Sequence, residues 1–300
     1  MSVAPADFYH ARAIKRSRRT SAQVEQLDLQ IIAALKADHP QSVRHVFYLM
    51  TNPRLPEPVE KSDRGYRHVQ HRLVELRASG RVPYGWVVDA TRNGFFVNTF
   101  SGAADFVERM THLYRADPWR DAEYRCEVWV ESRSLASVLL ETCQELAVTL
   151  YPSGGFASLS FTHDAAIQIN EDDDGRPLHI FYAGDYDPAG VLIDRKIEEA
   201  LRQHLDPAVK MTFERIGITQ AQIEHYDLPT KPRKEGDRRA LHIKETVEAE
   251  AMPAHIMRGL LRKRIEALLP ENALHVAAAA QASERGYLKE MAQTMGRDRA

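Results

Sequence analysis

The sequence of 300 residues has little cysteine and no long apolar segment. Its two cysteines, Cys126 and Cys143, match no metal-binding spacing and are too few for a disulfide framework, which is typical of a reducing compartment. No apolar run approaches the ~20 residues that a membrane-spanning helix needs. The first 19 residues lack the apolar core of a secretory signal. We therefore expect a cytoplasmic protein with no membrane segment.

The chain also lacks a strong net charge, but its charges are unevenly distributed. The formal net charge is −2, yet residues 1–92 hold 15 Lys and Arg against 9 Asp and Glu, and the remainder holds 25 against 33. This asymmetry favours a first part that faces nucleic acid and a second part that binds cations. Residues 1–19 form a basic arm, which is either a disordered tail or a segment that lies along DNA phosphates.

Three helical patterns follow the basic arm. A helix is expected to begin at Thr20, whose side chain can form a capping box with Gln23. Ser42 can cap a second, shorter helix, and a third helix is expected from Asp63 to Ala78. The segment Val82–Val88 then favours a strand pair. Three short helices followed by a β element are typical of a winged helix-turn-helix domain, which binds duplex DNA.

The basic side chains of the third helix lie outside its apolar stripe and are candidate DNA contacts. A basic helix face is often only a solvated surface, but the winged-helix pattern and the positive charge of this part favour DNA. We assign residues 20–92 to this domain and residues 93–122 to a less periodic connector. The candidate DNA-binding residues are Arg64, Arg67, His71 and Arg72.

The second helix carries a candidate nucleophile. Its apolar stripe is expected to centre more than about 90° away from Arg44 and Tyr48, which are four residues apart and so neighbour each other on the helix surface. A tyrosine outside the core and beside a guanidinium forms the phenolate more readily than its usual pKa of ~10 allows. A half-buried structural tyrosine explains the same pattern, and this helix alone favours that interpretation.

In the second part of the chain, strands alternate with helices, which is typical of a parallel sheet built from βαβ units. Two apolar runs, Val128–Val130 and Ile180–Ala183, read as buried strands of this sheet. Glu131 ends the first run, and Asp185 and Asp187 follow the second. Because chemistry in open α/β sheets sits at the carboxyl ends of the strands, we expect the three acids at one edge. Clustered carboxylates need a cation, and their hard oxygens select Mg²⁺, with Mn²⁺ as the alternative.

Taken alone, each of these acids is more often structural. Asp187 directly precedes a proline and could simply cap a helix. Capping explains neither Asp185 nor Glu131, so the three acids together favour a metal site. Glu248 and Glu250 could add further carboxylates, although their spacing also suits a solvated helix face.

Several sequence strings resemble a known family. VWVES, beginning at Val128, the later GGFASLSF, and YAGDYDPAG, beginning at Tyr182, are similar to the Toprim fold, and most of all to the A subunit of topoisomerase VI and its meiotic double-strand-break relatives. That family carries its catalytic tyrosine in an Arg-x-x-(aromatic)-Tyr string, which here runs from Arg44 to Tyr48. The resemblance implies a winged-helix domain followed by a Toprim-type parallel-sheet domain with a C-terminal helical extension, residues 123–300. The length most resembles compact stand-alone proteins of the Topo mini-A type.

The resemblance implies Mg²⁺-dependent cleavage of double-stranded DNA by transesterification. Tyr48 would attack a phosphodiester and leave a 5′-phosphotyrosyl link and a free 3′-hydroxyl, while Arg44 stabilises the charge. The metal ligands would be Glu131, Asp185 and Asp187, with Glu131 also counted as catalytic. A homodimer would cut both strands, combining Tyr48 of one subunit with the acids of the other. Strand passage would need a separate ATPase partner.

Two other functions remain open at this point. One is a Toprim nuclease in which metal-bound water attacks the DNA and Tyr48 takes no part. The other is a DNA-binding protein that performs no chemistry. Family members often have a lysine after the metal-binding glutamate, whereas this chain has Ser132 and Arg133, which leaves room for a redirected activity.

Overall fold

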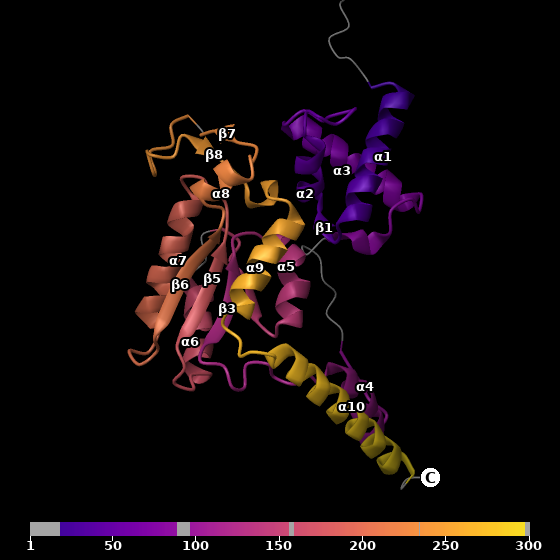
Figure 1. Cartoon of the computed structure of the whole chain (residues 1–300), viewed down its shortest axis with the longest axis vertical. Helices are drawn as coiled ribbons and strands as arrows, with labels where there is room; N and C mark the ends of the chain where they lie inside the picture. Colours follow the sequence, from indigo (N-terminus) through magenta and orange to yellow (C-terminus); the bar gives the residue numbers. More distant parts are fainter. Residues whose placement is uncertain (1–18, 89–96, 156–158, 234, 298–300) are drawn as a thin grey trace, which may run out of the picture.

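The computed structural model describes residues 19–88, 97–155, 159–233 and 235–297. In Figure 1 the N-terminal helices stand beside the parallel sheet, and a long C-terminal helix extends below both. The expected basic arm lies almost wholly outside the described residues, and so does the part of the expected winged-helix domain from residue 89 to residue 92. No helix among the described residues is both long enough and apolar enough to span a membrane.

The three N-terminal helices form where their capping residues predict. They are α1 (Ser21–Ala37), α2 (Val43–Met50) and α3 (Asp63–Ala78). Thr20 caps α1 in a capping box with Gln23, as expected. The side chains of Ser42 and Ser62 accept hydrogen bonds from backbone N–H groups in the first turns of α2 and α3. The sequence therefore determined these helix starts locally.

The β element after α3 differs from the expectation. The strand predicted from Val82 is wrong over Tyr84–Trp86, which forms a 3₁₀ turn, and only Val87–Val88 is a strand, β2. It pairs in parallel with β1 (Gln41–Ser42), just before α2. β2 is thus paired with the segment directly before α2. This pairing joins the chain that follows α3 to the start of α2.

The second part of the chain is a parallel sheet, as predicted. Its strands are β3 (Arg125–Val130), β4 (Thr149–Pro152), β5 (Leu178–Ala183) and β6 (Met211–Gly217), in the spatial order β4-β3-β5-β6 with all neighbours parallel. The helices α5 (Arg133–Glu145), α6 (Leu159–Glu171) and α7 (Gly190–His204) connect them. The chain is therefore a mixed α/β protein, with β3 and β5 paired at the centre of the sheet.

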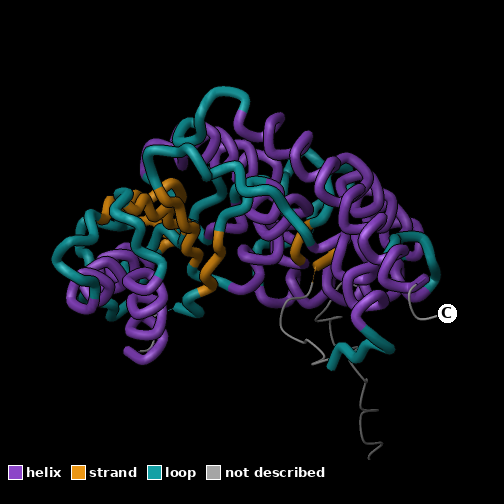
Figure 2. The backbone as a smooth tube through the Cα atoms, turned by 90° about the horizontal axis from the view of Figure 1, so that it is seen from below, coloured by secondary structure: helices purple, strands orange, loops and turns teal. Residues whose placement is uncertain are grey.

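Alternate residues of the central strands point into two hydrophobic clusters. Val128, Val130 and Phe181 belong to a cluster that also contains residues of α1, α2, α3, α5 and α9 (Ala254–Glu266). Trp129 and Tyr182 belong to the other cluster, with residues of α6 and α7. The N-terminal helices therefore share one core with one face of the sheet. Figure 2 shows the sheet at one side of the molecule and the short β1–β2 pair among the helices at the other.

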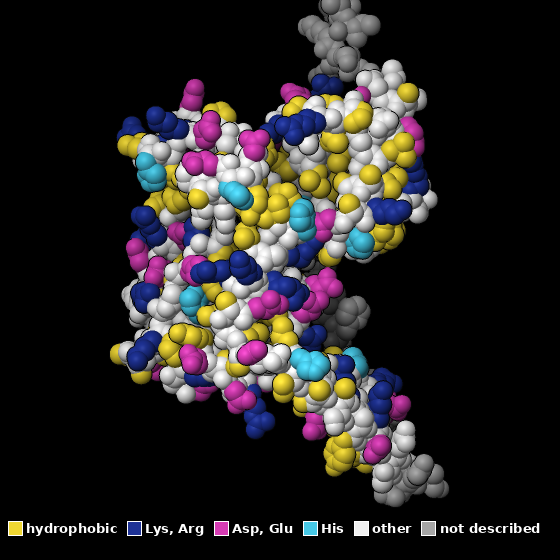
Figure 3. All heavy atoms as spheres, in the orientation of Figure 1, with side chains coloured by type: hydrophobic (Ala, Val, Ile, Leu, Met, Phe, Trp, Pro, Cys, Tyr) yellow, Lys and Arg dark blue, Asp and Glu magenta, His cyan; other side chains and the backbone are white. Residues whose placement is uncertain are grey.

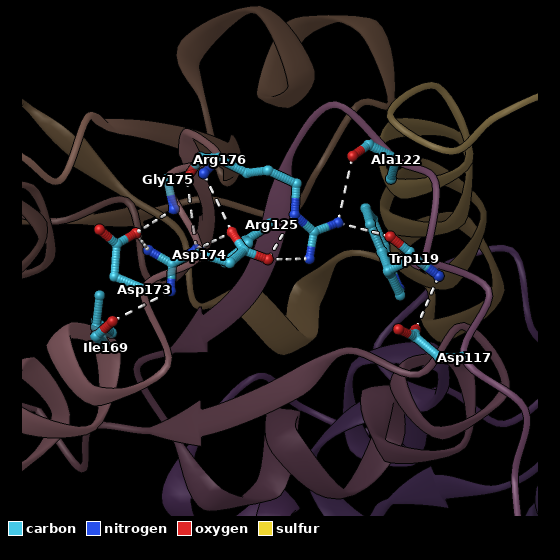
Figure 4. A network of polar contacts seen from close by, with 9 residues as sticks. All are labelled: Asp117, Trp119, Ala122, Arg125, Ile169, Asp173, Asp174, Gly175 and Arg176. Carbon is cyan, nitrogen blue, oxygen red and sulfur yellow. Dashed lines mark hydrogen bonds and ion pairs between the residues drawn. The ribbon is translucent and has the colours of Figure 1, made fainter.

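The connector folds against the C-terminal helix. Helix α4 (Ala103–Met110) and the 3₁₀ turn Thr111–Leu113 pack on α10 (Ala273–Arg297). Figure 3 shows this pair projecting from the body as an arm. At the other end of the connector, Arg176 donates hydrogen bonds to the carbonyl oxygens of Trp119 and Ala122 at 2.6 and 3.2 Å (Figure 4). Residues 119–122 are thereby anchored to the turn before β5, at the edge of the sheet opposite the acids.

The chain between β6 and α9, residues 218–253, passes across the carboxyl end of the sheet, and we call it the crossing segment. It contains α8 (Gln220–His225), the antiparallel strands β7 (Lys231–Pro232) and β8 (Glu245–Thr246), and the 3₁₀ turn Ala249–Ala251. Val247 pairs through its backbone with Tyr186, just after β5. The same 3₁₀ turn contacts α2. This crossing segment therefore lies between the N-terminal helices and the carboxyl end of β5.

Candidate active site

The acidic residues lie at the sheet edge that the sequence predicts. Val130 and Ala183 are paired at the ends of β3 and β5, and Glu131 follows the first while Asp185 comes two residues after the second. The backbone N–H of Glu131 also donates to the carbonyl oxygen of Ala183 at 3.0 Å. Parallel pairing thus places both strand ends at the carboxyl end of the sheet, together with the acids that follow them. We call this group, Glu131, Asp185 and Asp187, the acidic edge.

Each of the three acids accepts a backbone hydrogen bond with one of its oxygens. Glu131 Oε2 accepts from the N–H of Asp185 at 2.9 Å, and Asp185 Oδ1 accepts from the N–H of Ala249 at 2.8 Å. Asp187 Oδ1 accepts from two N–H groups at the start of α7, at 2.8 and 2.6 Å. The capping role considered for Asp187 is therefore real. For all three acids, the second carboxylate oxygen has no hydrogen-bond partner within the described part of the chain.

Burial, together with repulsion between neighbouring carboxylates, raises the pKa of two of these acids. The pKa of Asp185 is raised well above its usual value, first by burial and then by the charges of Glu131 and Glu250. Burial also raises the pKa of Glu131, with Asp187 and Glu250 adding to the shift. Such a cluster is typical of a functional site, because the fold keeps carboxylates together at a cost in stability.

The donor set fits Mg²⁺, although the observed side-chain positions do not form a finished metal site. Within the described ranges, no three His, Cys, Asp or Glu side chains are grouped closely enough to hold a metal ion. The buried hydroxyl of Tyr182 has no hydrogen-bond partner there either. A Cβ added to Gly184 would lie 2.7 Å from both that hydroxyl and Glu131 Oε2, so only glycine leaves room between them. Oxygen donors of this kind suit Mg²⁺ or Mn²⁺, and the metal site remains a prediction.

Arg215 on β6 positions the acidic edge, and sequence reasoning missed it. Its guanidinium donates to the carbonyl oxygens of Gly184, at 3.0 Å, and of Asp185. It also forms an ion pair with Asp194 at 2.6 Å. The guanidinium of Arg215 thus fixes the backbone of the loop that carries Asp185. Nothing in the alternation of β6 distinguishes this arginine, because its contacts come from other strands and helices.

Tyr48 is buried, which corrects the expectation that it lies outside the core. Its exposed fraction is 6%. The apolar stripe of α2 faces α1 and α3, but the opposite side, with Tyr48, is covered by the crossing segment. Burial and the neighbouring Glu248, through its charge and hydrogen bonding, raise the pKa of Tyr48 well above its usual value, and the opposing effect of Arg44 is smaller. The expected activation of Tyr48 by Arg44 is therefore absent in this state.

Arg44 instead forms an ion pair with Glu248 from the crossing segment. Its Nη1 lies 2.5 Å from Glu248 Oε2, while Lys231 Nζ lies 2.8 Å from Oε1 of the same carboxylate. Two residues later, Glu250 accepts hydrogen bonds from the hydroxyls of Ser132, at 3.1 Å, and Ser134. From the sequence, Glu248 is only a possible extra carboxylate of the acidic site, and nothing links Lys231 to it.

The crossing segment joins the tyrosine to the acidic edge within one chain. Its 3₁₀ turn packs against α2, and Ala249 in that turn donates to Asp185. On one side it carries Glu248, the ion-pair partner of Arg44. The 3₁₀ turn Ala249–Ala251 thus contacts both the helix that carries Tyr48 and Asp185, which follows β5.

The basic residues expected to contact DNA separate into two groups. Arg64, Arg67 and His71 are exposed and line a cavity of about 680 Å³ beside α3. Arg72 instead forms a bidentate ion pair with Asp28 of α1, with distances of 2.8 and 2.7 Å. Asp28 is only 1% exposed. Arg72 therefore neutralises a buried carboxylate, and its guanidinium is engaged within the fold.

Replacing Arg72 with alanine should therefore lower the stability of the fold. Removing one partner of a buried ion pair leaves an uncompensated charge, which costs several kcal/mol, and Arg81, 3.5 Å from Asp28, offsets part of this. We expect a loss of about 2 kcal/mol in the free energy of unfolding by urea. The exposed Arg67→Ala should leave stability unchanged. Equal stability of the two variants would contradict the structural role of Arg72.

His45, on α2 beside Tyr48, is a buried neutral histidine. Its ring is 1% exposed, Nδ1 lies 2.9 Å from the Ser42 hydroxyl, and Nε2 has no partner in the described part of the chain. Burial lowers its pKa from 6.5 to about 4, with Arg258 adding to the effect against Glu250 and Asp38. The folded protein therefore resists protonation that the unfolded chain accepts.

This difference predicts a loss of stability in mild acid. Because the folded pKa lies below the unfolded value, the stabilisation is complete above pH 6.5 and is lost as the pH falls towards 4. Between about pH 8 and pH 5 the loss should be on the order of 2 kcal/mol. Urea unfolding of the wild type and of His45→Gln at several pH values measures it. The difference between the two proteins should shrink in acid, and a constant difference would contradict the assignment.

Comparison with known proteins gives no relative for this chain. A scan against models of protein families finds no match, and searches of curated proteins and of solved structures find none either. The resemblance to the topoisomerase VI A family therefore rests on the sequence strings quoted above.

Proposed function

We propose that this protein is a Mg²⁺-dependent, DNA-cleaving protein similar to the A subunit of type IIB topoisomerases. The observation that supports it most is the crossing segment, which brings the helix carrying Arg44 and Tyr48 against the strand end carrying Asp185. In this proposal the N-terminal helices act as a winged-helix-type DNA-binding domain, and the parallel sheet acts as a Toprim domain. Arg64, Arg67 and His71 contact the DNA backbone.

The chemistry is a transesterification. The phenolic oxygen of Tyr48 gives up its proton and attacks the phosphorus, and the bond to the 3′-oxygen breaks. A 5′-phosphotyrosyl link forms and the 3′-oxygen takes up a proton, so that protons balance overall. Arg44 stabilises negative charge on the phosphate. Glu131, Asp185 and Asp187 would hold Mg²⁺, which when bound neutralises charge on the phosphate and the leaving oxygen. Their backbone hydrogen bonds fix one oxygen of each carboxylate and leave the other for the metal.

We include a homodimer in the proposal, since two tyrosines are needed to cut both strands. Tyr48 can then meet either the acids of its own chain or those of the second copy. Any passage of one duplex through the cut would depend on an ATPase partner. The protein is expected to act in the cytoplasm.

The test is incubation of the purified protein with supercoiled plasmid and Mg²⁺ or Mn²⁺, stopped with SDS. One half of each sample is treated with protease before electrophoresis. Cut DNA that enters the gel only after proteolysis is the expected result, because the protein remains attached to the 5′ ends. DNA that stays intact and uncut with either metal would contradict the proposal and leave a DNA-binding protein.

A metal-dependent nuclease is the second candidate, and the burial of Tyr48 favours it. A tyrosine that is 6% exposed, with a pKa raised well above its usual value, must be uncovered before it can attack DNA. A metal held by the acidic edge would activate water without Tyr48 being uncovered. In the plasmid test this candidate gives cut DNA whose mobility does not depend on protease.

A further inference from the structure

Two cations lie near the ring of Tyr48, and a third lies one helical turn before it. Lys61 Nζ and Lys231 Nζ lie 5.6 and 5.8 Å from the centre of its ring. Arg44 lies one helical turn before it and stacks over Tyr66, 5.5 Å from that ring centre. The three cations come from α2, from the loop before α3 and from β7. They line one cavity of about 280 Å³ together with Phe47, Ser62, Asp63, Tyr66 and Glu248.

Glu248 occupies the place where these cations converge. Each of its carboxylate oxygens receives one cation, Oε2 from Arg44 at 2.5 Å and Oε1 from Lys231 at 2.8 Å. The same carboxylate lies beside the Tyr48 hydroxyl. Two cationic donors and a phenol around one anionic group is the set of contacts that a phosphate needs next to an attacking tyrosine.

Lys61 shows that the cavity holds positive charge beyond what Glu248 satisfies. Within the described part of the chain, its one hydrogen bond goes to the carbonyl oxygen of Thr230, at 2.7 Å, and no carboxylate lies within ion-pair distance of it. Burial and the neighbouring Lys231 lower its pKa to about 8. An additional anion would relieve this repulsion, and a phosphodiester that replaced Glu248 would carry the same charge into the cavity.

Glu248 can leave this position without disturbing the acidic edge. Its side chain is 25% exposed, and those of Arg44 and Lys231 are 43% and 41% exposed, so water weakens both ion pairs. The hydrogen bond that holds the crossing segment to Asp185 comes from the backbone of Ala249, not from the side chain of Glu248. Rotation of the Glu248 side chain therefore leaves that attachment intact.

We propose that the cavity lined by Arg44, Lys61 and Lys231 is a phosphate-binding site, and that Glu248 occupies it as an intramolecular competitor until a phosphate displaces it. The identity of the phosphate as that of the cleaved DNA rests on the proposed function, but anion binding itself does not. Glu248 is a poor general base here, since Lys231 and Arg44 lower its pKa against the opposing effect of burial, the largest single influence. Its role is to cover Tyr48 in the absence of DNA.

The test measures the affinity for inorganic phosphate by isothermal titration, with no DNA present. Glu248→Gln should bind phosphate at least ten times more tightly than the wild type. Adding Lys231→Gln to that variant should remove the gain, because one of the three cations that line the site is lost. The matched control is Glu245→Gln, which removes the same charge three residues earlier from an exposed position on β8. Its affinity should stay within twofold of the wild type.

Each outcome decides the proposal. Equal affinity of the wild type and Glu248→Gln, or an equal gain in Glu245→Gln, would overturn it, the second by showing a general charge effect. If Glu248→Gln does not fold, Glu248→Asp takes its place, since a shorter side chain cannot reach both cations and should gain affinity to a smaller degree. A tight phosphate site in a protein that leaves plasmid uncut would support this inference and reject the tyrosine mechanism.

Discussion

Replacing Tyr48 with phenylalanine is expected to reduce protein-linked DNA by at least about a hundredfold, because the substitution removes the attacking oxygen. The ring itself remains, so its contacts with Lys61 and Lys231 and its place in the core are kept. Loss of a buried hydroxyl beside Glu248 should change the free energy of unfolding by only about 1 kcal/mol. The measurement is the amount of cut plasmid that depends on protease, compared between folded variants.

Tyr66→Phe is the matched control for this prediction. Tyr66 lines the same cavity as Arg44 and contacts its guanidinium, but its role in the proposal is structural. We expect this variant to retain linked DNA within a few-fold of the wild type. If Tyr48→Phe still cuts DNA and leaves free ends, the tyrosine mechanism is wrong and the nuclease becomes the better account. A loss in both variants would show only that the cavity is fragile.

Replacing Asp185 with asparagine should reduce DNA cleavage by at least about a hundredfold, because a proposed metal ligand is lost. The same substitution should make the folded protein more stable at neutral pH. The pKa of Asp185 is raised, first by burial and then by Glu131 and Glu250. A folded pKa above the unfolded value means that the charged form destabilises the fold, and that this cost is relieved as the pH falls below the folded value. Asparagine removes the charge and can still accept the hydrogen bond from Ala249.

Thermal unfolding measures the second half of this prediction. We expect the melting temperature of Asp185→Asn to rise by about 2–4 °C at pH 7, which corresponds to about 1 kcal/mol. Mg²⁺ should stabilise the wild type and have little effect on the variant, because a ligand that binds only the folded state raises its stability. Asp206→Asn, at an exposed position, is the control and should change neither property. A variant that is destabilised, or that still responds to Mg²⁺, would contradict the proposed metal role of Asp185.

The regular elements could be read from local sequence because their causes are local. Capping by Thr20 and Ser42 sets the starts of α1 and α2, and the apolar runs before Glu131 and Asp185 become the paired strands β3 and β5. Once the strands are parallel neighbours, strand-terminal acids must share an edge. The approximate place of the acidic site therefore followed from sequence, although the hydrogen bonds that orient each carboxylate did not.

The position of Tyr48 shows where local reasoning fails. The pattern of α2 separates the side facing α1 and α3 from the rest of the helix, and Tyr48 does lie off that first side. A helical wheel contains no information on a segment two hundred residues later in the chain, and that segment buries Tyr48. The sequence distinguished the tyrosine as unusual, but its exposure and its pKa depend on the crossing segment.

The charges around Tyr48 were likewise a product of tertiary structure. Arg44 and Glu248 are 204 residues apart, and no spacing rule links them to each other or to Lys61 and Lys231. The sequence by itself determined the helices, the parallel strands and the acids at their ends, because period, capping and strand ends act over a few residues. Only the packing of the crossing segment between α2 and the sheet decided which cations meet which carboxylate, since ion pairs depend on distance in space.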